Sequence, residues 1–419
     1  MRARFGLLLL ALALAVLALP AAAAGGGTRD AVGFGFRISD TGAAGNESDA
    51  RVAHGASADR FLAVWCDSRG TDDSRDIYGR LLGSEGRPLG RGIHISDNGA
   101  TGWEQYPAVA ANAVTGQYLV VWQDSRNPDP DDPLGSDIYG RLVSATGVPL
   151  GDGLPIATGA GESRNPAVAY DPATGGYLVV WQQWVPGSRD VYGRLLDATG
   201  VPAGDAFLIS TGGGTTGSPV VAYSPAADQF LVVWARWRGG AYTIRGRGVS
   251  GAGEVVGADF FVGTLDSKRS WDPDVAYDPV TDRFLVVWAR YDLTPEPHIY
   301  GRLVSGDGVP AGEELLISTR RGKNEMEPAV AYNPALGRFL VVWGDGRNGR
   351  RGVDIFGCLV SGAGEILDGE FRISGPGGTS DERYPAVASG STGRFLVVWQ
   401  DDHLYETRGW DIRGRLVES

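Results

Sequence analysis

Apolar and polar positions along the chain follow a pattern that recurs seven times. Its most regular part is a run of four apolar residues ending in tryptophan, which reads Leu-Ala-Val-Trp once and Leu-Val-Val-Trp six times. These tryptophans, spaced 53 to 59 residues apart, are Trp65, Trp122, Trp181, Trp234, Trp288, Trp343 and Trp399. Such a spacing indicates that one small structural unit is repeated along the chain.

Each copy of the unit contains four short segments that are typical of β-strands. In the third copy these are residues 166–170, 177–181, 190–196 and 207–210. They are rich in β-branched and aromatic residues and are bounded by Gly, Pro, Asp or Ser, as strands between tight turns are. Because no segment after residue 24 shows a helical period, the pattern predicts an all-β protein.

The second segment of each copy is apolar at consecutive positions, which predicts a strand buried on both faces. A four-stranded sheet gains that burial when it is packed between two similar sheets. Seven such sheets arranged around one axis form a β-propeller. We therefore predict a seven-bladed β-propeller of four-stranded antiparallel blades.

The two ends of the chain offer a test of this fold. The last copy ends with its third segment, residues 411–417, and lacks a fourth. Residues 36–39, Phe-Arg-Ile-Ser, match the fourth segment of the preceding copy at residues 371–374. We predict that the N-terminal strand completes the last blade, which closes the ring and removes an exposed sheet edge. The propeller then spans residues 36–419.

The repeated segments Val-Val-Trp-x-Asp-x-Arg and Asp-Ile-Tyr resemble the blades of secreted bacterial β-propeller repeat proteins, which are loosely similar to TolB-like propellers. The resemblance covers residues 36–417 and implies the fold without implying an activity. Neither the Asp-box of sialidases, Ser-x-Asp-x-Gly-x-Thr-Trp, nor the Gly-His and Trp-Asp signature of WD repeats is found. Neither function is therefore carried over.

The N-terminus predicts export. Residues 1–24 combine two arginines, a short apolar stretch and an Ala-x-Ala site, which is typical of a cleaved secretory signal peptide, and residues 25–35 form a linker. We expect an extracellular or periplasmic monomer without a membrane span. A net charge of -12 excludes nucleic acid as an expected partner. Cys66 and Cys358 fall on blades that are not neighbours, so we predict two buried free thiols.

The loops of a propeller fall on two faces. Turns from first to second and from third to fourth strand are short and alike in all copies. Loops from second to third strand, and from one copy to the next, vary in length, charge and aromatic content. We call the second set the irregular face. It is the candidate site, because function tends to lie on variable loops held by a rigid scaffold.

Six further aromatic residues fall on the irregular face. They are Trp184, Trp237, Tyr291, Trp271, Trp103 and Trp410. The first three occupy one position in three neighbouring blades, and Arg236 and Arg290 directly precede two of them. Aromatic rings beside arginines suit stacking on sugars or gripping a peptide, so these eight residues are predicted ligand contacts. The alternative is that the rings pack on each other and cover the blade ends.

Paired aspartates mark the other four blades. One follows the repeated tryptophan by two residues (Asp67, Asp124, Asp345 and Asp401), and one opens the third strand (Asp76, Asp137, Asp354 and Asp411). The pairs could bind calcium, which prefers several oxygen ligands. They could instead accept local hydrogen bonds and pair with arginines. We expect the second arrangement and no cofactor, with calcium as the alternative.

Seven more carboxylates fall near the starts of the first strands and predict an acidic rim around the channel mouth. They are Glu47, Asp49, Glu104, Asp272, Glu325, Glu327 and Glu382. Such a rim could hold a cation or a basic ligand, or it could simply be solvated.

Catalytic motifs are scarce in this sequence. It has no Gly-x-Ser-x-Gly elbow, phosphate loop or clustered His and carboxylate motif. We therefore favour a secreted binding module that recognises a glycan or a protein partner through the irregular face. The alternative is an extracellular glycan hydrolase or lyase that uses carboxylates at the channel mouth. A deep pocket with convergent acids and a raised pKa would indicate the enzyme, whereas a shallow aromatic face would suffice for a binding module.

Overall fold

The structure of the protein is a computed structural model. It describes residues 32–40, 45–68, 75–96, 102–126, 135–159, 161–185, 187–263, 269–291, 296–319, 323–349, 352–375, 380–402 and 409–418. The predicted signal peptide (1–24) and residues 25–31 of the predicted linker lie outside this part. Within it every named element is a β-strand, and no helix is long and apolar enough to cross a membrane.

Four strands build each blade. The first strands are β2 (Glu47–Gly55), β6 (Glu104–Ala111), β10 (Ser163–Tyr170), β14 (Thr215–Ser224), β18 (Ser270–Asp278), β22 (Met326–Asn333) and β26 (Glu382–Ser389). The second strands, which carry the repeated tryptophans, are β3 (Arg60–Asp67), β7 (Tyr118–Asp124), β11 (Tyr177–Val185), β15 (Gln229–Arg238), β19 (Arg283–Tyr291), β23 (Arg338–Asp345) and β27 (Arg394–Asp401).

The outer half of each blade follows in the same order. The third strands are β4 (Asp76–Gly83), β8 (Asp137–Val143), β12 (Ser188–Leu196), β16 (Ala241–Ser250), β20 (Pro297–Ser305), β24 (Asp354–Ser361) and β28 (Asp411–Glu418). The fourth strands are β5 (Pro88–His94), β9 (Pro149–Ala157), β13 (Phe207–Leu208), β17 (Val255–Phe261), β21 (Pro310–Leu316), β25 (Ile366–Arg372) and, for the last blade, β1 (Val32–Arg37). We number the blades 1 (β2 to β5) to 7 (β26 to β28 with β1).

Neighbouring strands within a blade pair antiparallel, in the order first to fourth. Five of the blades form separate four-stranded sheets in the described part of the chain. Blades 3 and 4 share one sheet through a single parallel contact between Arg189 and Thr215, and β13 in blade 3 has only two residues. The architecture confirms the predicted all-β propeller of four-stranded antiparallel blades.

The N-terminal strand closes the ring. Strand β1 pairs antiparallel with β28, with Phe36 opposite Gly414 and Arg37 opposite Arg413. The backbone N–H of Ile38 then donates to the carbonyl oxygen of Ile412 at 2.8 Å. This pairing confirms the predicted completion of the last blade. The strand begins at Val32, before the predicted start at residue 36, because pairing with β28 continues beyond a register shift.

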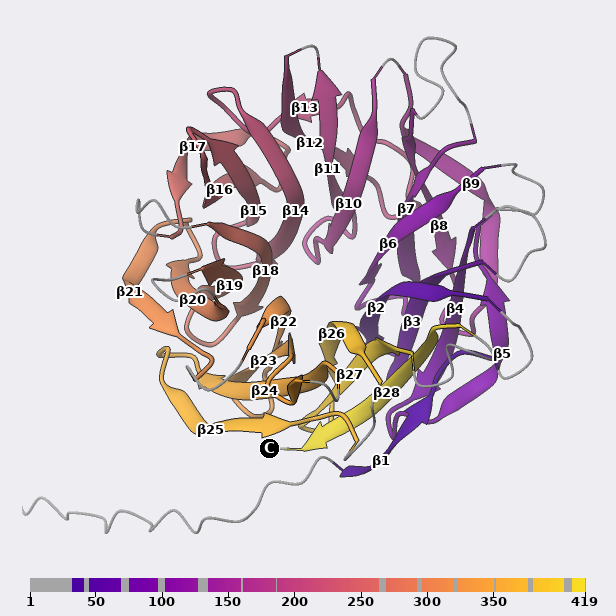
Figure 1. Cartoon of the computed structure of the whole chain (residues 1–419). Coiled ribbons are helices and arrows are strands. Elements are labelled where there is room, and N and C mark those ends of the chain that lie inside the picture. The colour runs from indigo at the N-terminus through magenta and orange to yellow at the C-terminus, as the bar shows by residue number, and fades with distance from the viewer. Residues whose placement is uncertain are drawn as a thin grey trace, which may run out of the picture.

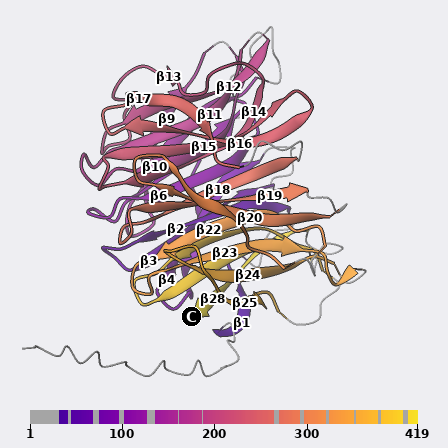
Figure 2. The same cartoon turned by 90° about the vertical axis from the view of Figure 1, so that its left-hand side faces the viewer.

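The first strands lie innermost around the centre of the propeller (Figure 1). Each contacts the first strand of the next blade, and β26 contacts β2. Turned by 90°, the strands run across the thickness of the molecule, so that their connections gather on two opposite faces (Figure 2). The turns predicted to be uniform share local chemistry: Asp171 accepts from the N–H of Ala173 at 2.7 Å, and Asp278 accepts from that of Val280 at 2.8 Å.

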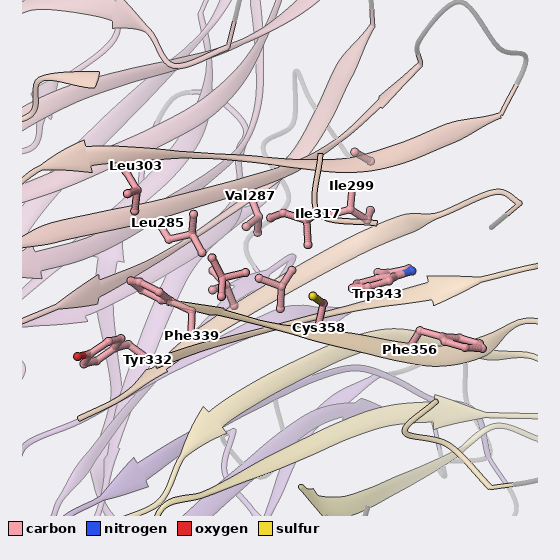
Figure 3. Close-up of a cluster of buried hydrophobic side chains, with 14 residues drawn as sticks. Leu285, Val287, Ile299, Leu303, Ile317, Tyr332, Phe339, Trp343, Phe356 and Cys358 are labelled. Carbon is pink, nitrogen blue, oxygen red and sulfur yellow. The ribbon is translucent and has the colours of Figure 1, made fainter. Parts of the chain in front are cut away.

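The hydrophobic core lies between neighbouring blades. All seven repeated tryptophans are buried, as are most residues of the second strands. Figure 3 shows the interface of blades 5 and 6, where Trp343 and Cys358 pack beside Val287 and Ile299. Cys358 and Cys66 belong to different core clusters, and both are buried and unpaired, as predicted.

Candidate functional site

Strained backbone positions surround the centre of the propeller. Each first strand shifts register against its second strand, and one residue at that shift has a left-handed backbone, with φ between 44° and 58°. These residues are Asp49, Tyr106, Asn165, Ser218, Asp272, Glu327 and Tyr384. Left-handed backbone costs an L-residue about 1–2 kcal/mol, and Asp and Asn tolerate it better than Tyr or Glu. Backbone strain of this kind clusters at functional sites.

Five residues on four consecutive blades interact at this ring, and we call them the central cluster: Asp49, Asp272, Glu327, Arg383 and Tyr384. The backbone N–H of Tyr384 donates to Oε2 of Glu327 at 2.8 Å. The charges of Glu327, Asp49, Arg383 and Asp272 all act on the Tyr384 hydroxyl. Residues from blades 1, 5, 6 and 7, far apart in the sequence, therefore share one electrostatic environment.

Burial raises the pKa values of two carboxyl groups in the central cluster. It raises the pKa of Glu327 to about 7, and the charge of Asp272 adds to the rise, whereas hydrogen bonding by Tyr384 and the charge of Arg383 oppose it. Burial also raises the pKa of Asp272 to about 6, against the charge of Arg51. Near neutral pH, Asp272 is mostly ionised while Glu327 still holds its proton in a large fraction of molecules. A protonated and an ionised carboxyl group that act on each other can serve as a general acid and a general base.

A second carboxylate of blade 5 supports this arrangement. Asp274 accepts a hydrogen bond from the backbone N–H of Val330 at 2.8 Å, which ties blade 5 to blade 6. Burial raises its pKa to about 6, against that hydrogen bond and the charge of Arg51. Arg51 is exposed and Arg383 pairs with Asp381 at 3.1 Å, so both signs of charge meet at the centre.

Four of the seven predicted rim carboxylates do not lie at an open rim. Glu47, Glu104, Glu325 and Glu382 are buried between blades, and burial raises the pKa of each to about 8. The prediction was wrong because the register shift adds a residue to each first strand, so that carboxylates two positions apart have different surroundings. Asp49, Asp272 and Glu327, at the shift itself, are the half-buried members.

Each of these four glutamates contacts the preceding blade. Oε2 of Glu47 accepts from the backbone N–H of Ile412 at 3.1 Å. Oε2 of Glu325 lies 2.9 Å from Nδ1 of His298, which is also buried. The glutamates therefore join blades and are not free to meet a ligand.

The aspartates after the tryptophans bind within their own blades. Asp124 accepts from Nε1 of Trp122 at 2.9 Å and from the backbone N–H of Arg126 at 2.8 Å. Asp67 and Asp345 accept from their own tryptophans at 3.3 and 3.4 Å. Among the described residues, no group of three or more His, Cys, Asp or Glu is arranged to hold a metal ion. These contacts match the expected arrangement, in which the aspartates accept local hydrogen bonds.

The predicted aromatic contacts divide into two kinds. Trp103, Trp184 and Trp237 are exposed, at 51%, 44% and 44%. Trp271 and Tyr291 instead pack on each other, with ring centroids 4.8 Å apart, and Trp410 is half-buried. Trp184 and Trp237 are linked by paired residues that run across the shared sheet of blades 3 and 4, from β11 through β12 and β14 to β15. Three strand spacings, or about 14 Å, separate them.

Arg236 and Arg290 are not exposed ligand contacts. Both side chains are buried: Arg236 pairs with Asp259 at 3.1 Å, and Arg290 pairs with Glu314 and lies 3.5 Å from the ring centroid of Tyr300. The expectation was wrong because each arginine finds a carboxylate on the fourth strand of its own blade, which a spacing pattern does not reveal. A buried, paired arginine is not available to a ligand.

Sequence reasoning missed Tyr384, Arg383, Arg51 and Tyr106. A signal was present, because in six of the seven blades the left-handed residue directly precedes a proline, as in Glu327-Pro328 and Tyr384-Pro385. An alignment of the copies on that proline collects the ring. It does not reveal which members interact, since that depends on the order of blades around the centre.

The comparisons with known proteins show the fold. No protein-family model and no curated protein matches the chain. A Dyadobacter fermentans protein of unknown function aligns with a TM-score of 0.55 and 14% identity, over 93% of this chain and 98% of its own. The α-L-arabinofuranosidase Arb93A of Fusarium graminearum aligns at 0.50 and 13%, over 78% and 97%. The NanB sialidase of Streptococcus pneumoniae aligns at 0.50 and 10%, over 91% and 70%. At these identities the chain is similar to them in its β-propeller fold alone.

Proposed function

We propose that the protein is a glycoside hydrolase whose reaction takes place at the central cluster. The observation that carries this proposal is the interacting pair of Glu327 and Asp272, with pKa values of about 7 and about 6. Glycoside hydrolysis commonly uses one protonated and one ionised carboxyl group. Two of the propellers with similar folds carry the names of glycan-cleaving enzymes, an α-L-arabinofuranosidase and a sialidase. This agreement favours hydrolysis over simple binding.

In this proposal Glu327 is the general acid, since burial keeps its proton at neutral pH, and Asp272 is the ionised carboxylate on the neighbouring blade. Tyr384 is a positioning residue, because its backbone N–H holds Oε2 of Glu327. The positive charge of Arg51 opposes the rise in the pKa of Asp272, and that of Arg383 opposes the rise in the pKa of Glu327.

The test is hydrolysis of a panel of polysaccharides and aryl glycosides, including arabinosides and sialosides, by the parent and by Glu327→Gln and Asp272→Asn. We expect both variants to lose about a hundredfold or more in kcat/KM. The parent's kcat/KM should peak between pH 6 and 7, since Asp272 must be ionised and Glu327 protonated. Glu313→Gln, at an exposed glutamate, is the matched control. Full activity in Glu327→Gln would overturn the proposal.

A glycan-binding role without cleavage is the second candidate. The exposure of Trp103, Trp184 and Trp237 favours it, because exposed indole rings stack on sugars. This candidate is supported if no substrate is cleaved while Trp184→Ala and Trp237→Ala weaken binding on a glycan array. It is abandoned if both variants bind as the parent does.

We also propose that residues 1–24 are removed during export and that the propeller, from Val32 onward, acts as one unit outside the cytoplasm. The N-terminal pattern supports this. Mass spectrometry of the protein recovered from the culture medium or periplasm tests it. A mature chain that still begins at Met1 would refute it.

A further inference from the structure

A cavity of about 300 Å³ lies between blades 2 and 3, away from the central cluster. Trp181, Gln183 and Val185 of β11 and Tyr192 of β12 form one side of it, and Thr158, after the end of β9, belongs to the other. Its volume is at the small end of the range for ligand sites, which suits one small ring.

The repeat explains why this blade has a cavity. In three other blades an arginine guanidinium lies over the aromatic ring of the third strand: Arg126 over Tyr139 at 4.2 Å, Arg290 over Tyr300 at 3.5 Å and Arg347 over Phe356 at 4.0 Å. Those arginines occupy the second or fourth position after the repeated tryptophan. In blade 3 these positions hold Gln183 and Val185. The chain therefore supplies no guanidinium to cover Tyr192 from either position.

The carboxylates that hold those arginines are replaced as well. Arg126 pairs with Asp124 and Glu104, and the equivalent residues in blade 3 are Gln183 and Ser163. Arg347 pairs with Glu370 on β25. The next residue, Phe371, lies opposite Gly357 of β24. In blade 3 the equivalent phenylalanine is Phe207, which lies opposite Gly193 of β12. The residue before it is Ala206, so the position of the glutamate holds an alanine.

All three acidic positions are thus neutral in blade 3, and the two-residue strand β13 shortens the outer wall. A cation would meet no carboxylate among the lining residues, and the one charged residue among them, Arg194, already donates to two backbone carbonyl oxygens. An uncharged polar ligand is the class that remains.

The polar groups of the cavity are oriented. Oε1 of Gln183 accepts from Nε1 of Trp181 at 2.9 Å and from Oγ of Ser163 at 2.8 Å. These bonds fix the amide so that its NH₂ group serves as a donor. The Arg194 guanidinium is occupied, since it donates to the carbonyl oxygens of Gly204 and Ile156, both at 2.7 Å.

We propose that this cavity is a binding site for an uncharged sugar ring of a glycan. The ring stacks on Tyr192, where other blades place their own arginine, and its hydroxyl groups bond to the amide of Gln183. The site goes beyond the proposed hydrolysis and does not depend on it. It holds a glycan between blades 2 and 3, away from the central cluster.

The test titrates the parent with uncharged sugars (arabinose, xylose, galactose, glucose and their disaccharides) and with galacturonate and glucosamine as charged analogues. Saturation-transfer NMR and tryptophan fluorescence report binding. The double variant Gln183→Asp/Val185→Arg recreates the Asp124 and Arg126 pair of blade 2 and should fill the cavity. We expect it, and Tyr192→Leu, to weaken binding of the preferred uncharged sugar about tenfold or more. Gln183→Glu keeps the side-chain size and should weaken it too.

Asp272→Asn separates this proposal from the proposed function, since it should abolish hydrolysis and leave binding at this cavity unchanged. The proposal is overturned if no uncharged sugar binds, if a charged analogue binds better, or if the folded double variant binds as the parent does.

Discussion

Glu47 offers the sharpest test of how the blades are joined. It is 2% exposed between blades 7 and 1, and burial raises its pKa from 4.5 to about 8, with the charges of Asp67 and Asp411 adding to the rise. The unfolded chain loses this proton near pH 4.5, whereas the folded chain keeps it to about pH 8. Between those values the folded state binds one more proton. Raising the pH through this window therefore removes stability.

The substitution Glu47→Gln removes this pH dependence, because an amide resembles the protonated acid and carries no charge. A pKa rise from 4.5 to about 8 corresponds to about 5 kcal/mol. For a propeller of this length, that amounts to about 6 °C in the melting temperature. We expect the variant to melt close to the parent at about pH 4 and up to about 6 °C above it at about pH 9. Thermal unfolding followed by circular dichroism across this range measures the difference.

The matched control is Glu313→Gln, since Glu313 is exposed. Its melting curve should follow the parent's at every pH. The reasoning is refuted if Glu47→Gln destabilises the protein more at high pH than at low pH, because that result would mean that the folded protein stabilises the ionised carboxylate.

Three further predictions concern strain, thiols and closure. Tyr106→Asn should raise the free energy of unfolding by about 1 kcal/mol in urea denaturation, because Asn tolerates a left-handed backbone; equal or lower stability contradicts strain at that position. Cys66 and Cys358, whose pKa values burial raises to about 12, should resist a thiol-labelling reagent at neutral pH until the protein unfolds; rapid labelling of the native protein would show that they are accessible. Ile38→Ala should lower the free energy of unfolding by about 2–5 kcal/mol, because this fully buried residue packs blade 7 on blade 1; a loss below about 1 kcal/mol would mean that the closing strand contributes little.

The central cluster shows where prediction from the sequence ended. The acidic residues near the first strands were visible in the sequence as a group. Glu325 and Glu327 nevertheless have different surroundings, although only one residue separates them. The first is buried against His298, and the second interacts with Tyr384 on the next blade. The register shift between Met326 and Ala329 produces this difference, and a bulge of this kind is not apparent from the alternation of polar and apolar residues.

The sequence by itself determined the architecture. The repeated tryptophan, the fully apolar second strands and the recurring turns are local signals, and they were enough to predict the all-β propeller. The match of residues 36–39 to a fourth strand predicted the closure that β1 makes with β28, because a repeat identifies a missing piece without any knowledge of packing. The two unpaired thiols followed from the order of blades.

Only the tertiary structure decided which side chains meet. Arg236 and Arg290 have the sequence context of ligand contacts, yet Asp259 and Glu314 on the fourth strands hold them inside their blades. The cavity beside Tyr192 exists because several replacements in one blade coincide in space. Partner choice among charged groups depends on distance, burial and backbone direction across strands and blades, and these quantities arise only when the ring is assembled.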